Sequence, residues 1–157
     1  MSGILPRLQK CLDENAVEYE VISHQTDYRA RETARDTRTP SAEFAKTVFV
    51  MLDERPAIAV VPASNDVALA RLRDAAAAKE VCLANEDEIE AICPDCEVGA
   101  APPFGNLYDL PVYVSLSLAA DEQITFNAGT HRDAIRMSYI DFARLVDPIV
   151  AAICKHE

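Results

Sequence analysis

Two apolar runs in the middle of the chain stand out from the polar sequence around them. The first extends from Val48 to Leu52 and the second from Ala57 to Val61, with the polar residues 53–56 between them. Continuous runs of β-branched and aromatic residues are typical of strands that are buried on both faces. Two such runs across a short polar turn predict a β-hairpin at the centre of a sheet.

Apolar spacing elsewhere predicts helices and short strands on both sides of this hairpin. Helical spacing or capping signals favour helices over 4–15, 30–37, 67–79, 86–92 and 140–146. We expect Ser64, Asn65 or Asp66 to cap the third of these helices. Strand patterns occur at 17–22, 81–83, 111–114, 123–127 and 135–139. The short intervals between these elements predict a single α+β domain over residues 1–157.

Lys46 is the first candidate for a functional side chain. It lies where the predicted central strand leaves the sheet, at a position where a pocket can open. A lysine there is costly to desolvate unless its ammonium reaches water or meets an anion. Two roles stay open: the Lys46 stem snorkels so that its ammonium reaches water, or the ammonium is unpaired in the free protein and available to an anionic ligand.

The charge of the chain limits its contact with nucleic acids. The formal net charge is −11, but residues 28–48 carry five basic and three acidic side chains, a local charge of +2 that leaves −13 elsewhere. Such a protein can contact a few phosphates but would repel a long duplex, so we expect no extended DNA binding.

Targeting signals are not apparent in the sequence. No apolar run approaches the ~20 residues of a membrane span, and the N-terminal residues do not resemble a secretory signal. We therefore expect a cytoplasmic protein that does not bind membranes. The odd number of cysteines, five, then favours reduced thiols.

Cys93 and Cys96 have the Cys-x-x-Cys spacing of zinc sites and redox dithiols. A zinc site needs two further ligands with compatible spacing, and the sequence has no second pair. A catalytic dithiol usually opens a helix after a strand, whereas this motif follows a predicted helix. A structural role is favoured, and a dithiol oxidoreductase remains a remote alternative in which Cys96→Ser would abolish activity.

Two later stretches carry candidate chemistry. The irregular loop from Gly99 to Asn106 combines glycines, which allow backbone amides to approach a ligand, with prolines, which stiffen the chain. The turn Gly129-Thr130-His131 follows a predicted strand, where sites commonly form. His24 and His131 could each border a pocket. The sequence contains neither a Gly-x-Ser-x-Gly elbow nor a His-Glu-x-x-His motif, so a conventional hydrolase centre is not indicated.

Together these features resemble the YbaK-like, prolyl-tRNA-synthetase-associated editing domain family, whose members hydrolyse mischarged aminoacyl-tRNA. The resemblance covers about residues 12–146. It is carried by Phe44-Ala45-Lys46-Thr47, Val60-Val61-Pro62-Ala63, the loop from Gly99 to Gly105 and Asn127-Ala128-Gly129-Thr130-His131. It implies an α+β fold with a central mixed, barrel-like sheet flanked by helices.

The resemblance also implies roles for individual residues. Lys46 would hold the phosphate of the terminal adenosine, and backbone amides of the loop would polarise the ester carbonyl, with Gly99 and Pro103 shaping this catalytic part. Substrate would contact His24, Ala100, Ala101, Pro102, Phe104, Gly105, Gly129, Thr130 and His131, and tRNA would contact Arg29, Arg31, Arg35 and Arg38. Arg132 and Arg136 are further candidates for phosphate contacts, with surface ion pairs as the alternative.

The resemblance implies a deacylase that acts on the acceptor end of a tRNA charged with a small wrong amino acid. It implies neither metal nor cofactor, and it leaves open an aminoacyl-tRNA synthetase as a partner. Ala100, Ala101 and Pro102 replace residues that are serine in some relatives, so the amino acid is not defined. The alternative is a non-catalytic module of the same fold that binds aminoacyl-tRNA or a nucleotide.

Overall fold

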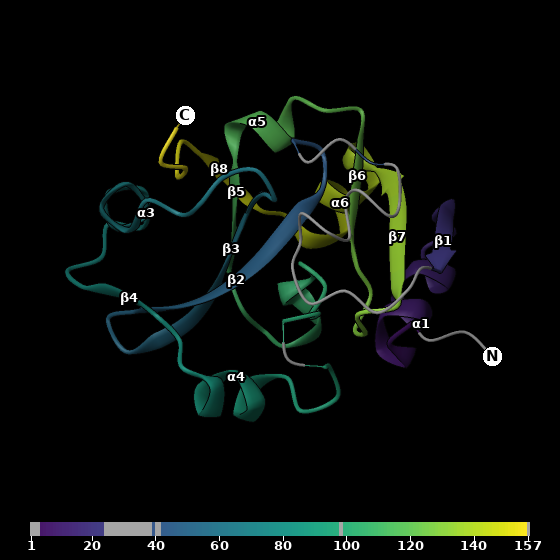
Figure 1. The fold of residues 1–157 in the computed structure, drawn as a ribbon, viewed down its shortest axis with the longest axis horizontal. Helices are drawn as coiled ribbons and strands as arrows, with labels where there is room; N and C mark the ends of the chain where they lie inside the picture. Colours follow the sequence, from purple (N-terminus) through teal and green to yellow (C-terminus); the bar gives the residue numbers. More distant parts are fainter. Residues whose placement is uncertain (1–3, 24–38, 40–41, 98, 157) are drawn as a thin grey trace.

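The computed structural model describes residues 4–23, 39, 42–97 and 99–156. Figure 1 shows two sheets side by side, with helices around them. The predicted helix at 30–37 lies outside the described residues, as do His24, Arg29, Arg31, Arg35 and Arg38. Their predicted roles stay predictions.

The larger sheet contains the predicted hairpin. Its strands are ordered β4 (Val81–Leu83), β2 (Ala45–Leu52), β3 (Arg55–Pro62), β5 (Val112–Ser115) and β8 (Ile149–Ala151). β2 pairs antiparallel with both β3 and β4, whereas β3–β5 and β5–β8 are parallel, so the sheet is mixed as expected. Asp53 and Glu54 form the hairpin turn with φ of 48° and 68°. Positive φ at both positions matches the right-handed twist of hairpin strands.

The smaller sheet is antiparallel and has the order β1 (Tyr19–Ser23), β7 (Asp133–Ser138) and β6 (Gln123–Asn127). A parallel bridge between Phe44 and Thr125 connects it to the start of β2. Because this bridge is isolated and the sheets are not closed, the expectation of a barrel-like sheet holds only loosely. The mixed α+β fold is confirmed.

The helices agree with the sequence pattern over most of their length. They are α1 (Pro6–Glu14), α3 (Leu69–Ala76), α4 (Glu86–Ile92), α5 (Leu116–Ala119) and α6 (Tyr139–Val146), with a 3₁₀ turn η1 at Gly105–Leu107. The capping box of α4 is present, since Asn85 and Glu88 exchange hydrogen bonds of 2.8 and 2.9 Å. The predicted cap of α3 is wrong, because Ala68 occupies the N-cap position without a side-chain hydrogen bond.

Burial corrects the expectation about the central strand. β2 was expected to be buried on both faces, but Val48, Met51 and Leu52 are only partly buried. β3 is instead buried from Ala57 to Pro62. The reason is packing: Ile58 and Val60 of β3 belong to one core cluster and Ala57, Ala59 and Val61 to another, so both faces of β3 are covered. Val48 and Leu52 of β2 only border the second cluster.

An aromatic cluster joins the loop region to the core. Phe104 is fully buried, and its ring centroid lies 5.5 Å from that of Phe126 and 5.4 Å from that of Phe142. Phe126 comes from β6 and Phe142 from α6, so this contact fixes the loop against the smaller sheet. In the part of the chain that is described, no helix combines the length and apolar character needed to cross a membrane.

Candidate active site

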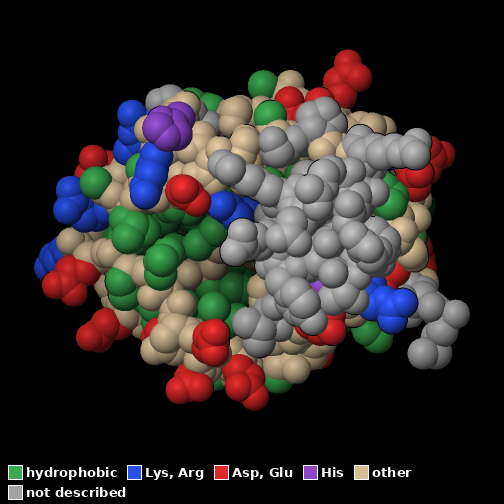
Figure 2. Space-filling view, in the orientation of Figure 1, with side chains coloured by type: hydrophobic (Ala, Val, Ile, Leu, Met, Phe, Trp, Pro, Cys, Tyr) green, Lys and Arg blue, Asp and Glu red, His purple; other side chains and the backbone are tan. Residues whose placement is uncertain are grey.

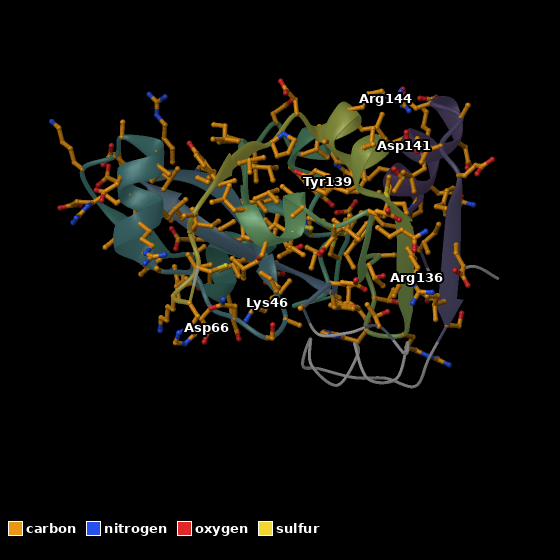
Figure 3. All side chains as sticks on the ribbon, turned by 90° about the horizontal axis from the view of Figure 1, so that it is seen from above. Lys46, Asp66, Arg136, Tyr139, Asp141 and Arg144 are labelled. Carbon is orange, nitrogen blue, oxygen red and sulfur yellow. The ribbon has the colours of Figure 1, made fainter. Side chains whose placement is uncertain are left out.

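Lys46 is the second residue of β2, and its side chain is directed toward the turn after β3 (Figure 3). Its Nζ donates to the carbonyl oxygen of Asn65 at 2.8 Å and to Asp66 Oδ1 at 3.1 Å. The Lys46 side chain is 28% exposed and that of Asp66 is 71% exposed. The expectation of an unpaired lysine is therefore wrong. An exposed partner such as Asp66 gives up its contact at small cost when a stronger anion arrives.

The loop from Gly99 to Gly105 (the Gly99 loop) and the turn Gly129-Thr130-His131 (the Gly129 turn) lie against each other, as the site hypothesis requires. Gly129 N donates to Ala100 O at 2.9 Å. A Cβ built on Gly99 would lie 3.4 Å from Cε1 of His131, so the imidazole lies on the side of Gly99 from which a side chain would project. Both glycines have positive φ, +82° at Gly99 and +104° at Gly129. Side chains are strained in this conformation, which explains glycine at both positions.

Glu97 holds these two segments together. Its backbone N donates to Gly129 O at 2.8 Å, its carbonyl accepts from Ala100 N at 3.0 Å, and its Oε1 accepts from His131 N at 2.7 Å. Glu97 was not identified from the sequence. Two of these three contacts join residues more than thirty positions apart, and only its place shortly before the loop could have drawn attention to Glu97.

The loop offers fewer amides than the resemblance implies. Ala100 N is engaged by Glu97, and Pro102 and Pro103 have no amide hydrogen. Within the described part of the chain, the amides of Gly99, Ala101 and Gly105 donate to no other residue. Unengaged amides that a fixed backbone holds in place are the groups that can bind a developing oxyanion.

Side chains of the loop are buried to a degree that the sequence did not predict. Ala100, Ala101, Pro102, Pro103, Phe104 and Gly105 are all buried. The Phe104 side chain belongs to the core and presents no surface to a ligand, so its predicted substrate contact lacks support in this conformation. A Cβ on Gly105 would lie 2.5 Å from Leu110 O, so close packing requires glycine there.

Two further polar side chains lie near the turn, Asn127 at the end of β6 and Asp133 at the start of β7. Phe44, two residues before Lys46, forms an isolated parallel bridge with Thr125, which brings the start of β2 beside β6. Asn127 Oδ1 is buried and has no hydrogen-bond partner among the described residues. Thr130 Oγ1 donates to Asp133 Oδ2 at 3.1 Å, which fixes the turn from the other side. Neither Asn127 nor Asp133 was singled out as a functional side chain.

Arg136 has structural partners. Its guanidinium donates to Thr39 Oγ1 at 2.8 Å and pairs with Glu20 at 3.4 Å. In Figure 3 it lies toward β1, away from Lys46. This contact favours the ion-pair alternative over a phosphate contact. Arg132 is exposed.

Acidic side chains surround the rim of the face shown in Figure 2, while lysine and arginine gather over α3 on its left. Arg29, Arg31, Arg35 and Arg38 lie outside the described residues, so the small nucleic-acid footprint stays a prediction.

Among the described residues, Cys93, Asp95 and Cys96 form a group that could hold a metal ion, with their ligand atoms within 4.8 Å of one another. The motif follows α4, as the sequence predicted, with Cys93 at the C-cap. It does not include any residue of the Gly99 loop or the Gly129 turn.

The sequence and the fold were compared with those of known proteins. The model of the aminoacyl-tRNA editing domain matches residues 24–145. The chain belongs to the aminoacyl-tRNA editing domain family. The match includes Lys46, the Gly99 loop and the Gly129 turn, so the three segments identified in the sequence all lie within the editing domain. A comparison with curated protein sequences gave no match.

Solved structures share the fold of this editing domain at low sequence identity. A proposed trans-editing enzyme for prolyl-tRNA synthetase has a TM-score of 0.86 and 19% identity, with 99% of each chain covered. The hypothetical protein APE2540 has a TM-score of 0.85 and 16% identity over 95% of this chain and 99% of that one. A protein from a study of epitope grafting onto scaffolds has a TM-score of 0.86, 18% identity and 99% coverage of both chains.

Proposed function

We propose that this editing domain is an aminoacyl-tRNA deacylase that hydrolyses the ester of a tRNA carrying a small wrong amino acid. Family membership supports an editing role, and a solved structure with the same fold is a proposed trans-editing enzyme for prolyl-tRNA synthetase. The observation that carries the proposal is the Gly99 loop, whose unengaged amides are held next to His131 and Gly129 by Glu97.

In the proposed reaction, Lys46 exchanges Asp66 for a phosphate of the terminal adenosine. This contact positions the ester carbonyl at the amides of Gly99 and Ala101. Water attacks the carbonyl carbon, and the amides stabilise the charge that develops on its oxygen. The C–O bond to the ribose then breaks, which releases the free amino acid and restores the ribose hydroxyl group. Because the ester is already activated, positioning and charge stabilisation can suffice without a side-chain nucleophile.

The proposed partner is the acceptor end of tRNA, and an aminoacyl-tRNA synthetase is a second candidate. We expect no metal or cofactor to take part in the reaction. Among the described residues, the site lacks the clustered histidine ligands of a hydrolytic zinc centre, and the sequence contains no motif of an activated serine. Loss of activity in chelator and its return with zinc would contradict this expectation.

Single-turnover deacylation of a panel of mischarged tRNAs tests the proposal. We expect ester loss at least about tenfold above the uncatalysed rate for one or more small amino acids. Gly99→Ala should reduce this rate because a Cβ is strained at φ +82° and presses on His131. Asn106→Ala is the matched control, since Asn106 is exposed directly after the loop.

A non-catalytic module would bind aminoacyl-tRNA without hydrolysing it. The same panel distinguishes the two functions when binding is measured alongside ester loss. Binding with no acceleration for any substrate would contradict the deacylase proposal. A reduced rate in Asn106→Ala equal to that in Gly99→Ala would show that the loop amides are not the sensitive element.

A further inference from the structure

The turn that follows α4 (Figure 1) carries Cys93 and Cys96, whose thiols face each other. Cys96 N donates to Cys93 O at 3.3 Å, which closes a turn with the cysteines at its ends. Such a turn holds its end Cα atoms within about 7 Å, a separation that a disulfide can bridge. The Sγ atoms of Cys93 and Cys96 are 2.7 Å apart. A disulfide bond is about 2.05 Å long, so only a small displacement separates the thiols from bonding distance.

We propose that Cys93 and Cys96 form a reversible dithiol–disulfide site that reacts with low-molecular-weight disulfides. Both cysteines are free thiols in this structure. The site is separate from the deacylation chemistry proposed above, and it requires no catalytic role for either cysteine. It lies directly before Glu97, the residue that fastens the Gly99 loop to the Gly129 turn.

The geometry favours a dithiol over a metal site. Two thiolates on one tetrahedral zinc ion, each about 2.3 Å from the metal, would lie about 3.8 Å apart. The observed 2.7 Å is far shorter. Asp95, the third member of the cluster, is already bound by Arg7 Nε at 2.7 Å. A metal would therefore have to separate the sulfurs and displace the arginine.

Neighbouring side chains hold the pair in place. Tyr108 OH lies 3.3 Å from Cys96 Sγ and donates to Asp95 Oδ1 at 3.2 Å. Arg7 packs over the Tyr108 ring at 4.9 Å and donates to Leu107 O at 3.2 Å. These contacts tie α1 and η1 to the turn, so the thiols are presented by a fixed framework rather than by a free loop.

The two thiols differ in acidity and in access. The hydrogen bond between them lowers the pKa of Cys93 and, together with burial, raises the pKa of Cys96. Cys93 is 3% exposed, whereas Cys96 is only partly buried. Cys96 is therefore the sulfur that an oxidant can reach, and Cys93 is the more acidic sulfur behind it. The C-terminal end of α4 opposes a thiolate, so we expect closure to be slower than at a helix N-terminus.

Closure proceeds in two exchange steps. Cys93 first gives its proton to water, and Cys96 then passes its proton to the Cys93 thiolate. The Cys96 thiolate attacks a disulfide RSSR, forms a mixed disulfide and releases one RS⁻, which takes up the proton from water as RSH. Cys93 Sγ then attacks Cys96 Sγ and releases the second RSH. The protein loses two electrons and two protons, and RSSR is reduced to two molecules of RSH. Excess thiol reverses both steps.

The experiment equilibrates the full chain in glutathione buffers of increasing oxidised fraction, quenches with an alkylating agent and maps cysteines by mass spectrometry. We expect the peptide containing Cys93 and Cys96 to lose two hydrogens and both alkylation sites, and to regain them in dithiothreitol. Mixed disulfide on this peptide should stay below about one tenth of the closed form, because the second attack is intramolecular.

Two variants complete the test. Cys96→Ser should abolish closure, whereas Cys82→Ser should leave it unchanged, since Cys82 is exposed on β4. Thermal melting of the reduced variants checks folding, and the wild-type peptide map is decisive by itself. The proposal is overturned if both cysteines remain alkylated in fully oxidised glutathione. It is also overturned if the purified protein contains stoichiometric zinc whose removal is needed to expose the thiols.

Discussion

Replacing Lys46 by alanine separates its structural contacts from its proposed role with phosphate. In the free protein its Nζ bonds the Asn65 carbonyl at 2.8 Å and Asp66 at 3.1 Å. Because the Asp66 side chain is 71% exposed, this ion pair contributes about 0.5 kcal/mol or less. Water can reach the Asn65 carbonyl once the lysine stem is gone. We expect a total loss of about 1 kcal/mol in unfolding free energy, or about 2–4 °C in Tm.

The expected loss of activity is much larger. A charge-assisted contact between Lys46 and a phosphate is worth about 1.5–3 kcal/mol. Since about 1.4 kcal/mol corresponds to a factor of ten, Lys46→Ala should lower kcat/KM about 10- to 100-fold. Lys46→Arg should recover only part of this, because a planar guanidinium replaces a compact point charge poorly in a narrow site.

Asp66→Asn is the matched control. It removes the same ion pair but leaves the lysine, which is then easier to engage with phosphate. We expect equal or higher activity with a change in unfolding free energy below about 0.5 kcal/mol. Thermal melting and single-turnover deacylation of wild type and all three variants provide the comparison. Full activity in Lys46→Ala would refute the phosphate role, and parallel losses of activity in Lys46→Ala and Asp66→Asn would show that the ion pair itself matters.

Four other predictions concern stability and binding. Gly129→Ala should lower the free energy of unfolding in urea by about 1–3 kcal/mol, since φ is +104° and the new Cβ would lie 2.9 Å from Leu5 Cβ. An unchanged urea midpoint would contradict this backbone strain. Phe104→Ala should cost about 3–5 kcal/mol in the same assay, because the ring is fully buried between two others, and a loss below 1 kcal/mol would place it outside the core. Burial and the charge of Glu43 raise the pKa of Asp121, so the ionised carboxylate lowers stability as pH rises. Asp121→Asn should therefore raise Tm at pH 7 and lose this advantage below about pH 4. An equal effect on Tm at both pH values would refute the raised pKa as the cause. Binding of tRNA should depend on salt with a slope for about two to four phosphate contacts, and a slope for eight or more would show a larger interface.

Local sequence signals predicted most elements of this editing domain correctly. The hairpin of β2 and β3, the capping box of Asn85 and Glu88, and β6 at Gln123–Asn127 agree with the structure. Each is specified by residues close in sequence: a polar turn between apolar runs, a side chain three residues from its partner, and a short apolar strand. α5 and β8 were missed because a four-residue helix and a three-residue edge strand are too short to establish a period.

The residues of the candidate site also fall into two groups, those that the local sequence predicted and those that it did not. Lys46, the Gly99 loop and the Gly129 turn could be selected from the sequence, since a lysine at a strand end and positive-φ glycines have local causes. Their partners could not. Asp66 pairs with Lys46 across the β2–β3 hairpin, and Glu97 joins the loop to a turn more than thirty residues away.

The sequence by itself therefore determined the elements, the family resemblance and the positions where backbone conformation requires glycine. Only the tertiary structure decided which side chains are buried and which groups are paired. It placed Phe104 in the core, left the Gly99 and Ala101 amides unengaged among the described residues, and brought the Cys93 and Cys96 thiols within 2.7 Å. The reason is physical: burial and pairing depend on which distant segments pack together, and no local pattern of residues encodes that contact.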